Sequence, residues 1–231
     1  MPYKIKVLNY VDWLSSEVKI LGAVNTIVVD KKDKLLGYNT DWYGALKSIE
    51  EVLERKVKKK DRVAVLGSGG AARALVYGLL KRTENITVFF RTPISLKTKN
   101  FIKDFDKKIE IFSYGQQKRF YDTLCQSDIV CNATNVGMWP KTNRSLISKE
   151  FFSALNQNSN LSNKLFFDVI FNPYETLFLQ RAKKYGAKIK SGLSMMIYQG
   201  VIAFELWTNR KVKKEIIKKV KPILKNCLLH E

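Results

Sequence analysis

The sequence predicts an α/β protein in which a doubly wound parallel sheet is joined to a second, smaller α/β lobe. Two observations predict it. Beyond residue 61, short apolar runs alternate with helical segments, and a glycine-rich turn directly follows the first of these runs. The chain has 231 residues and a hydrophobic content of 45%, which suffices for one or two domains with a sizeable core.

The glycine turn lies within residues 62–74, which read RVAVLGSGGAARA. Apolar residues 63–66 predict a strand, and the Ala-rich residues 71–82 predict a helix. Glycines in such a turn let the backbone approach a diphosphate, whose charge then faces the helix N-terminus. Glycine pairs also close ordinary turns, but a strand before and a helix after are what the dinucleotide fingerprint requires. We therefore predict a dinucleotide site in a Rossmann-type domain.

The residues before this turn predict a partial lobe of their own. Apolar residues recur at helical spacing over residues 1–22, which favours one helix there. Residues 23–30 and 35–41 are typical of a hairpin, and residues 42–53 of a second helix. The charged connector at residues 56–61 marks the predicted boundary, so we expect residues 1–55 to form the smaller lobe, joined by C-terminal helices at about residues 210–231.

Residues 61–209, which include the glycine turn, are expected to form the dinucleotide-binding domain. Its further strands are predicted at residues 86–90, 109–113, 127–132, 165–170 and 187–190. Residues 141–164 are polar and rich in Asn and Ser, which favours a loop with one helical turn near Phe151. An amphipathic helix is expected over residues 195–207, and a last helix from residue 213.

The charge of the chain is strongly basic, with 41 Lys and Arg against 21 Asp and Glu, a net charge of +20. The lysines are scattered in twos and threes, which is typical of a solvated surface. A small anionic molecule is the alternative partner for this charge. No nucleic-acid-binding motif occurs, so we expect no nucleic-acid partner.

The cysteine and histidine content narrows the chemistry. Three cysteines at irregular spacing predict neither a disulfide framework nor a zinc site, and they favour a reducing cytoplasm. No signal peptide and no apolar run of about 18–20 residues is recognised, so no membrane association is expected. The only histidine is His230, beside the end of this sequence. We therefore expect chemistry without a catalytic histidine and without a bound metal.

Arg91 follows the second strand of the predicted sheet. In nicotinamide-binding folds an acidic residue about 20 positions past the glycines binds the ribose 2′-hydroxyl, whereas an arginine accommodates a 2′-phosphate. Arg91 therefore favours NADP over NAD. The alternative is a solvated arginine at a strand end.

Eight short strings occur in one order along the chain. They are PYK (2–4), GAVNT (22–26), GYNTD (37–41), GSGGAARA (67–74), RT (91–92), NATNVGM (132–138), DVIFNPYET (168–176) and GLSMMIYQG (192–200). Together they resemble the shikimate dehydrogenase family, with its quinate-oxidising relatives, over essentially the whole chain. The resemblance implies reversible, NADP-linked reduction of the 3-ketone of 3-dehydroshikimate to shikimate, in the pathway to aromatic amino acids.

The resemblance also implies residue roles. Lys4 and Asp41 would be the catalytic pair, Asn25 and Gln199 would hold substrate hydroxyls, and Phe171 stands where the family has a tyrosine that contacts the substrate. The implied cofactor contacts are Gly67, Ser68, Gly69, Gly70, Ala71, Ala72, Arg91, Thr92 and Gly192, with Asn132, Thr134 and Val169 at the nicotinamide end.

Elementary chemistry agrees with a lysine–carboxylate pair. Hydride delivery to a ketone leaves an alkoxide that needs a proton, and the only histidine is remote, so a lysine is the expected donor. Burial lowers the pKa of a lysine and a nearby carboxylate raises it again, which makes such a couple reversible. Lys4 could instead be a surface lysine, Asp41 a helix N-cap, Asn25 a turn residue, and Gln199 a partner of a backbone group.

The chain departs from the family pattern at its start. The Ser-x-Ser segment that binds the substrate carboxylate is not found, and Met1 directly precedes the PYK string. We expect a family member begun at an internal methionine, in which the smaller sheet lacks its first strands. A non-catalytic dinucleotide-binding remnant is the alternative, as is a quinate or shikimate dehydrogenase using NAD. Tyr-x-x-x-Lys spacings typical of short-chain dehydrogenases occur three times and are ascribed to chance. Both a monomer and a homodimer stay open.

Overall fold

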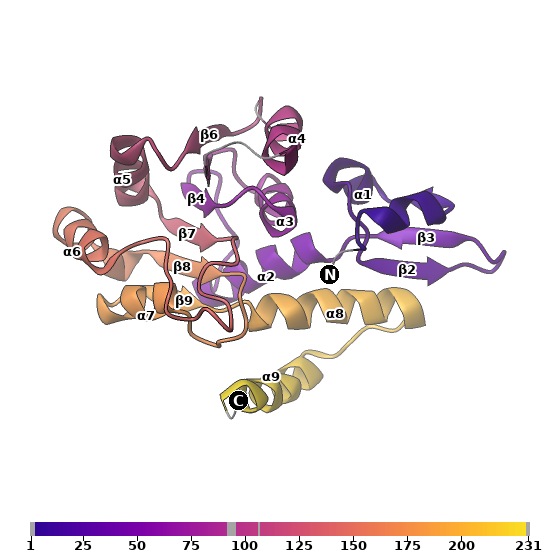
Figure 1. Cartoon of the computed structure of the whole chain (residues 1–231). Helices are drawn as coiled ribbons and strands as arrows, with labels where there is room; N and C mark the ends of the chain where they lie inside the picture. Colours follow the sequence, from indigo (N-terminus) through magenta and orange to yellow (C-terminus); the bar gives the residue numbers. More distant parts are fainter. Residues whose placement is uncertain (1–2, 92–95, 106, 230–231) are drawn as a thin grey trace.

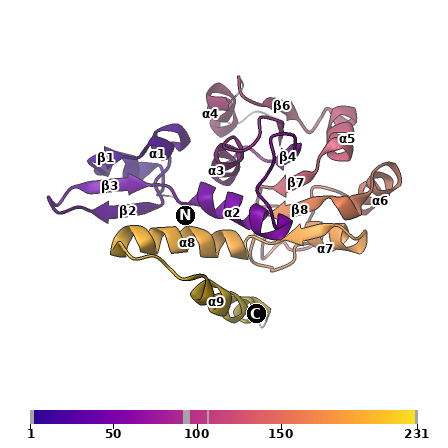
Figure 2. The same ribbon diagram turned by 180° about the vertical axis from the view of Figure 1, so that it is seen from behind.

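The computed structural model describes residues 3–91, 96–105 and 107–229. A six-stranded sheet with helices around it lies beside a three-stranded sheet (Figure 1). Two helices, α2 (Asp41–Leu53) and α8 (Leu193–Thr208), run between the two sheets. The view from behind shows the same arrangement, with the C-terminal helix α9 (Lys214–Leu229) below α8 and in contact with it (Figure 2).

The larger sheet is entirely parallel, and its order is β6-β5-β4-β7-β8-β9. The strands are β4 (Val63–Leu66), β5 (Ile86–Phe90), β6 (Glu110–Ser113), β7 (Ile129–Asn132), β8 (Leu165–Asp168) and β9 (Lys188–Lys190). The order reverses between β4 and β7, where Leu66 pairs with Asn132. This reversal is the topological switch point at which such sheets bind ligands. The predicted doubly wound sheet is confirmed.

Helices cover both faces of this sheet because alternate side chains of each strand point to opposite sides. Val63 and Val65 pack in one core with residues of α2, α3 (Gly70–Leu79) and α4 (Leu96–Phe105). Ala64 and Leu66 pack in the other core with residues of three further helices. These are α5 (Gln117–Gln126), α6 (Lys149–Asn158) and α7 (Leu177–Lys184).

The smaller sheet has the order β1-β3-β2. Strands β2 (Thr26–Val29) and β3 (Leu35–Tyr38) are antiparallel, which confirms the predicted hairpin. Strand β1 (Trp13–Leu14) pairs parallel with β3. The register places Thr26 opposite Tyr38, so the residues just before β2 and just after β3 lie at the same end of this sheet.

The single helix predicted for residues 1–22 is wrong. The described part of that segment holds a 3-10 helix (Lys6–Tyr10), strand β1 and a short helix α1 (Ser16–Leu21). The Asp12 and Ser15 amides donate to the Leu35 and Gly37 carbonyls of β3 at 2.8 and 3.0 Å. Pairing with β3 therefore satisfies this backbone in place of helical bonds and overrides the helical spacing of the apolar residues.

The loop predicted for residues 141–164 is also wrong in part. It contains the ten-residue helix α6 and a 3-10 turn (Leu161–Asn163). The Ser148 hydroxyl caps α6 by accepting the Phe151 amide, and Phe152 and Leu155 are buried beneath it. Two of the Asn residues that suggested a loop, Asn156 and Asn158, are exposed on this helix, which is anchored by the two apolar side chains.

The two C-terminal helices agree with the predicted ones within two residues at their starts. In the described ranges, no helix is both long and apolar enough to cross a membrane.

Candidate active site

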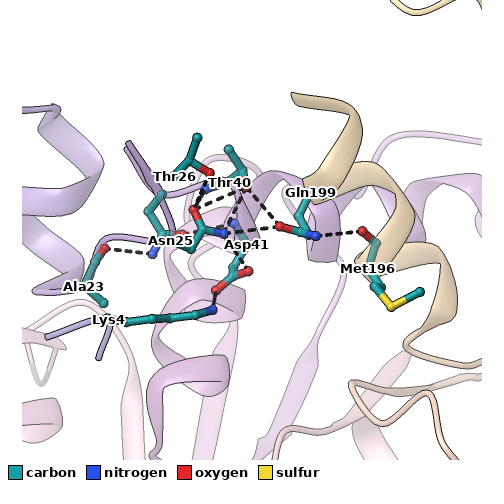
Figure 3. A network of polar contacts seen from close by, with 9 residues as sticks. Lys4, Ala23, Asn25, Thr26, Thr40, Asp41, Met196 and Gln199 are labelled. Carbon is teal, nitrogen blue, oxygen red and sulfur yellow. Dashed lines mark hydrogen bonds and ion pairs between the residues drawn. The ribbon is translucent and has the colours of Figure 1, made fainter. Parts of the chain in front are cut away.

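Four predicted site residues meet in one polar network (Figure 3). The Lys4 ammonium lies 2.6 Å from Asp41 Oδ2, although the two residues are 37 positions apart in the chain. The Asn25 amide donates to Asp41 Oδ1 at 2.9 Å. Gln199, from the far end of the sequence, reaches the same Asn25 amide at 3.4 Å. The residues therefore come from three separate segments: the chain start, the hairpin with α2, and α8.

Asp41 is the first residue of α2, and Thr40 is the N-cap, so the predicted N-cap role of Asp41 is wrong by one position. A carboxylate in the first turn interacts favourably with the positive end of the helix dipole. The Asp41 amide donates to Asn39 Oδ1 at 3.1 Å, and the Asn39 side chain donates to the Ala23 carbonyl at 3.0 Å. Asn39 thus ties the start of α2 to the loop before β2.

Asn25 is held in one orientation by its own oxygen. Asn25 Oδ1 accepts the Thr40 amide at 2.9 Å and the Thr26 hydroxyl at 3.0 Å. These bonds turn Nδ2 toward Asp41, Thr40 and Gln199. Asn25 is therefore a structured member of the network and not a plain turn residue.

Gln199 has a backbone partner as well as network partners. Its Nε2 donates to the Met196 carbonyl at 2.9 Å, and its Oε1 lies 3.4 Å from Thr40 Oγ1. Thr40 therefore joins the network although the sequence reasoning did not select it. Its position in the GYNTD string, directly before Asp41, was the available signal.

The Lys4–Asp41 pair is only partly shielded from solvent. The exposed fractions of the two side chains are 28% and 18%. The Lys4 carbonyl accepts the Val24 amide at 2.9 Å, which fixes the backbone of Lys4 beside the loop that carries Asn25. An ammonium held against a carboxylate, within reach of solvent-sized molecules, is able to give and take a proton.

A cavity of about 320 Å³ lies at the switch point of the larger sheet. It is lined by Gly69, Gly70, Ala71, Ala133, Thr134, Asn135, Met138, Val169, Ile170, Phe171 and Asn172. Six of the predicted site residues are among them. Of these, Phe171 is 42% exposed. Asn135 and Met138 belong to the NATNVGM string but were not selected individually.

The glycine turn beside this cavity fits a dinucleotide diphosphate. A Cβ added at Gly69 or Gly70 would meet no described atom within 4 Å, so open space lies along the turn. The first intrahelical bond of α3 runs from the Arg73 amide to the Gly69 carbonyl, which leaves the preceding amides directed to the helix N-terminus. Gly67 has a φ of +118°, which favours glycine, and the Ser68 hydroxyl bonds Thr98 Oγ1 at 2.8 Å.

Asn132 shapes the cavity from beneath and is not among the residues that line it. It is buried, and its Nδ2 lies 3.1 and 3.2 Å from the two Asp168 oxygens and 3.2 Å from the Val136 carbonyl. Its Oδ1 accepts the Thr134 amide. Burial raises the pKa of Asp168 to about 6, and hydrogen bonds from Thr176, the Ile170 amide and Asn132 oppose the shift. Asn132 and Asp168 thus hold the two loops that do line the cavity.

Gly192 also acts through packing. A Cβ there would lie 2.1 Å from the Val169 carbonyl oxygen, so only glycine allows the start of α8 to approach the end of β8. Arg91 is exposed directly after β5, and Thr92 lies outside the described residues. Within the described ranges no cluster of metal-ligating side chains occurs, and Cys125, Cys131 and Cys227 are free thiols.

Comparison with known proteins gives one family. Residues 192–220 match the family model described as the Shikimate 5'-dehydrogenase C-terminal domain. A protein of Methanococcus vannielii named shikimate dehydrogenase (NADP(+)) is 36% identical over 222 residues, which span 94% of this chain and 74% of that relative. The chain belongs to the shikimate dehydrogenase family.

Solved shikimate dehydrogenases share the fold. One crystal structure, in complex with NADP+, superposes with a TM-score of 0.79 at 32% identity, over 96% of this chain and 73% of that one. A shikimate 5-dehydrogenase of Listeria monocytogenes, in complex with shikimate and NAD, gives 0.82 at 28% identity, over 95% and 75% of the two chains. The resemblance and the Rossmann-type fold expected of a shikimate dehydrogenase are both confirmed.

Proposed function

We propose that the chain is an NADP-dependent shikimate dehydrogenase. It transfers hydride reversibly between NADPH and the 3-ketone of 3-dehydroshikimate, giving shikimate in aromatic amino acid biosynthesis. The observation that carries the proposal is the Lys4–Asp41 pair, with Nζ and Oδ2 2.6 Å apart and two side-chain amides in the same network. The family membership of the chain supports the same reaction.

The proton is handled by Lys4. When bound, NADPH supplies the hydride, and the substrate oxygen then needs a proton. The Lys4 ammonium donates it in the reductive direction, and the Lys4 amine takes it back in the oxidative direction. Asp41 Oδ2 holds the Lys4 nitrogen, while Asn25 donates to Oδ1 and so fixes the carboxylate plane. Asp41 thereby orients the proton donor.

The substrate hydroxyls are bound by Asn25 and Gln199. A side-chain amide offers both donors and an acceptor, as vicinal hydroxyls require. The Gln199 nitrogen carries two N–H groups, and its bond to Met196 uses one of them. Phe171, at the cavity, supplies an apolar contact where the family has a tyrosine.

The cofactor is held at the switch point of the sheet. The diphosphate would be received at the start of α3 by the backbone of Gly67, Ser68, Gly69, Gly70, Ala71 and Ala72. Arg91 would bind the 2′-phosphate, and Thr92 is proposed as a further cofactor contact from its place in the sequence. Thr134 and Val169 would line the nicotinamide end, and Asn132 and Gly192 would support it through the loops that they hold in place. The open space at Gly69 and Gly70 supports this assignment.

Turnover of shikimate with NADP+ by the purified chain tests the reaction. Lys4→Ala should lower kcat by about 10²- to 10⁴-fold, the usual contribution of a general acid, and leave the Kd for NADP+ within about threefold. Lys118→Ala is the matched control, since that lysine is 92% exposed in an ion pair far along the chain. Equal loss of turnover and of NADP+ binding in Lys4→Ala would contradict the assignment. NADP+ binding without any turnover by the unaltered chain would favour the non-catalytic alternative.

We also infer the organisation around this site. The smaller sheet supports a substrate lobe of residues 1–55, joined by residues 210–231, beside a cofactor domain of residues 61–209. The free cysteines are in keeping with a cytoplasmic protein. A monomer or a homodimer that acts on a small molecule, without nucleic acid, accords with the dispersed lysines.

A further inference from the structure

Arg73 joins two parts of the molecule that the proposed reaction needs together. It lies on α3, one turn past the glycine turn, and its side chain is 15% exposed. Its Nε donates to the Leu21 carbonyl at 3.0 Å, and its Nη2 donates to the Ile20 carbonyl at 2.9 Å. Both carbonyls belong to α1, which packs on α3 from the smaller lobe.

These two hydrogen bonds cap the C-terminal end of α1. Carbonyls in the last turn of a helix have no intrahelical partner. A cation there also interacts favourably with the negative end of the helix dipole. Helix α1 spans only six residues, too short to be stable without tertiary contacts. Arg73 supplies two of these contacts from the cofactor-binding helix.

The capped end of α1 leads directly to the catalytic network. Gly22 reverses the chain with a φ of +62°, and Val24 follows two positions later. The Val24 amide donates to the Lys4 carbonyl at 2.9 Å, and Asn25 is the next residue. The segment fixed by Arg73 therefore carries Asn25 and holds the backbone of Lys4.

We infer that Arg73 is a positioning residue of the proposed reaction. It sets Lys4 and Asn25 relative to the diphosphate turn, since it is anchored on the helix that this turn begins. The expected effect on shikimate turnover rests on the proposed function, whereas the expected effect on the structure around Val24 does not. Arg73 acts through α1 and takes no part in the chemistry.

Two other roles make different predictions. Arg73 also forms an ion pair with Asp104 at 2.6 Å, so it could act only by fixing α4. As a cation near the glycine turn, it could instead bind the diphosphate. Asp104→Asn removes the ion pair and leaves both carbonyl bonds in place. Arg82→Ala is the matched control, because Arg82 follows the other end of α3 and pairs with Glu50 on α2 at 2.8 Å.

The kinetic test compares these variants. Arg73→Ala should lower kcat/KM for shikimate by about 10- to 100-fold, the cost of misplacing reacting groups by a fraction of an ångström to one ångström. The Kd for NADP+ should stay within about threefold. Asp104→Asn and Arg82→Ala should keep kcat/KM within about threefold, and Arg73→Lys should recover part of the loss. If Asp104→Asn matches Arg73→Ala, or if the loss lies in NADP+ binding, the inference is overturned.

Hydrogen exchange gives a readout that does not depend on turnover. The Val24 amide, bonded to the Lys4 carbonyl, should exchange at least about tenfold faster in Arg73→Ala than in the unaltered chain, and at an unchanged rate in Asp104→Asn. Unchanged Val24 exchange in Arg73→Ala would refute the positioning role. An unaltered chain that does not turn over shikimate would refute the proposed function alone. If Arg73→Ala does not fold, Arg73→Lys and Arg73→Gln are compared by the same two measurements. Unaltered kcat/KM and unaltered Val24 exchange in Arg73→Gln as well as in Arg73→Lys would refute the positioning role.

Discussion

Replacing Gly44 by alanine has two effects of opposite sign on stability: a gain in helix propensity and a loss from overpacking. Gly44 lies in the first turn of α2, three positions after Asp41, against the start of α8. A Cβ added there would lie 2.5 Å from the Met195 carbonyl oxygen, 3.0 Å from the Gln199 nitrogen and 3.1 Å from Gln199 Cβ. All of these atoms are fixed to the backbone of α8, so no side-chain rotation relieves the overlap.

The magnitudes decide the outcome of Gly44→Ala. Helix propensity alone would stabilise the variant by about 1 kcal/mol. Overpacking costs about 1 to 3 kcal/mol, and a 2.5 Å contact with a backbone oxygen belongs at the upper end. We therefore expect a net loss of about 2 kcal/mol, which lowers Tm by roughly 4 to 8 °C in a chain of this size. The same shift of α8 displaces Gln199, so kcat/KM for shikimate should fall at least about tenfold.

Thermal unfolding and steady-state kinetics measure both effects, and Gly200→Ala is the matched control. Gly200 lies in α8, and a Cβ there would meet no described atom within 4 Å. Only helix propensity acts at that position, so Tm should rise by roughly 2 to 4 °C. If Gly44→Ala melts at or above the temperature of the unaltered chain, with kcat/KM unchanged, the packing argument is refuted.

Two further outcomes are expected. Arg91→Ala should raise the Kd for NADP+ about 10- to 100-fold, because a charge-assisted contact is lost, and raise the Kd for NAD+ less than about threefold. Fluorescence titration measures both constants. Equal effects on the two would contradict the 2′-phosphate role of Arg91. Burial raises the pKa of Glu51, but hydrogen bonds from Lys190 and Lys221 outweigh it and lower the pKa to about 2. The lowered pKa stabilises the folded state above about pH 4.5, so Glu51→Gln should lower the free energy of unfolding by about 1 to 2 kcal/mol at pH 7 after solvent screening. The difference in Tm between this variant and the unaltered chain should shrink as the pH falls from 5 to 3. A difference that is constant with pH would show that the carboxylate charge is not involved.

The larger sheet was predictable because its central strands are buried on both faces. Strands β4 and β7 are buried at every position, so β4 reads as a continuous apolar run and β7 as an apolar run that ends at Asn132. The glycine turn is recognisable for a related reason, since its backbone conformation restricts the residue type at Gly67. Local sequence therefore contains most of the information for this half of the molecule.

The start of the chain was not predictable in the same way. Val11, Leu14 and Val18 recur at helical spacing, yet Leu14 pairs with Gly37 in a parallel ladder. The partner strand lies more than twenty positions away, so no local pattern reveals it. The loop predicted for residues 141–164 was wrong in part because the signal for a helix there is small. Two buried side chains and one cap fix a helix whose other residues favour a loop.

The candidate site depends still more on tertiary placement. The Lys4–Asp41 pair was expected from the family resemblance, and the residues themselves showed only that a lysine was needed. Thr40 and Arg73 were missed because their contacts are with residues 159 and 52 positions away. Such contacts become readable only when the helices that carry them are placed.

Helix α2 explains why these distant contacts converge. Asp41 begins it, Gly44 lets it meet α8, and Glu51 in its last turn bonds lysines from β9 and α9. On its other side the Trp42 carbonyl oxygen would lie 2.8 Å from a Cβ at Gly78 of α3. The helix is thus fixed against the substrate network, the cofactor helix and the C-terminal helices at once. A shift of α2 along its axis would therefore move the Asp41 carboxylate away from Lys4 and strain three separate packing contacts. The position of Asp41, and through it that of the proposed proton donor, thus depends on the packing of several helices.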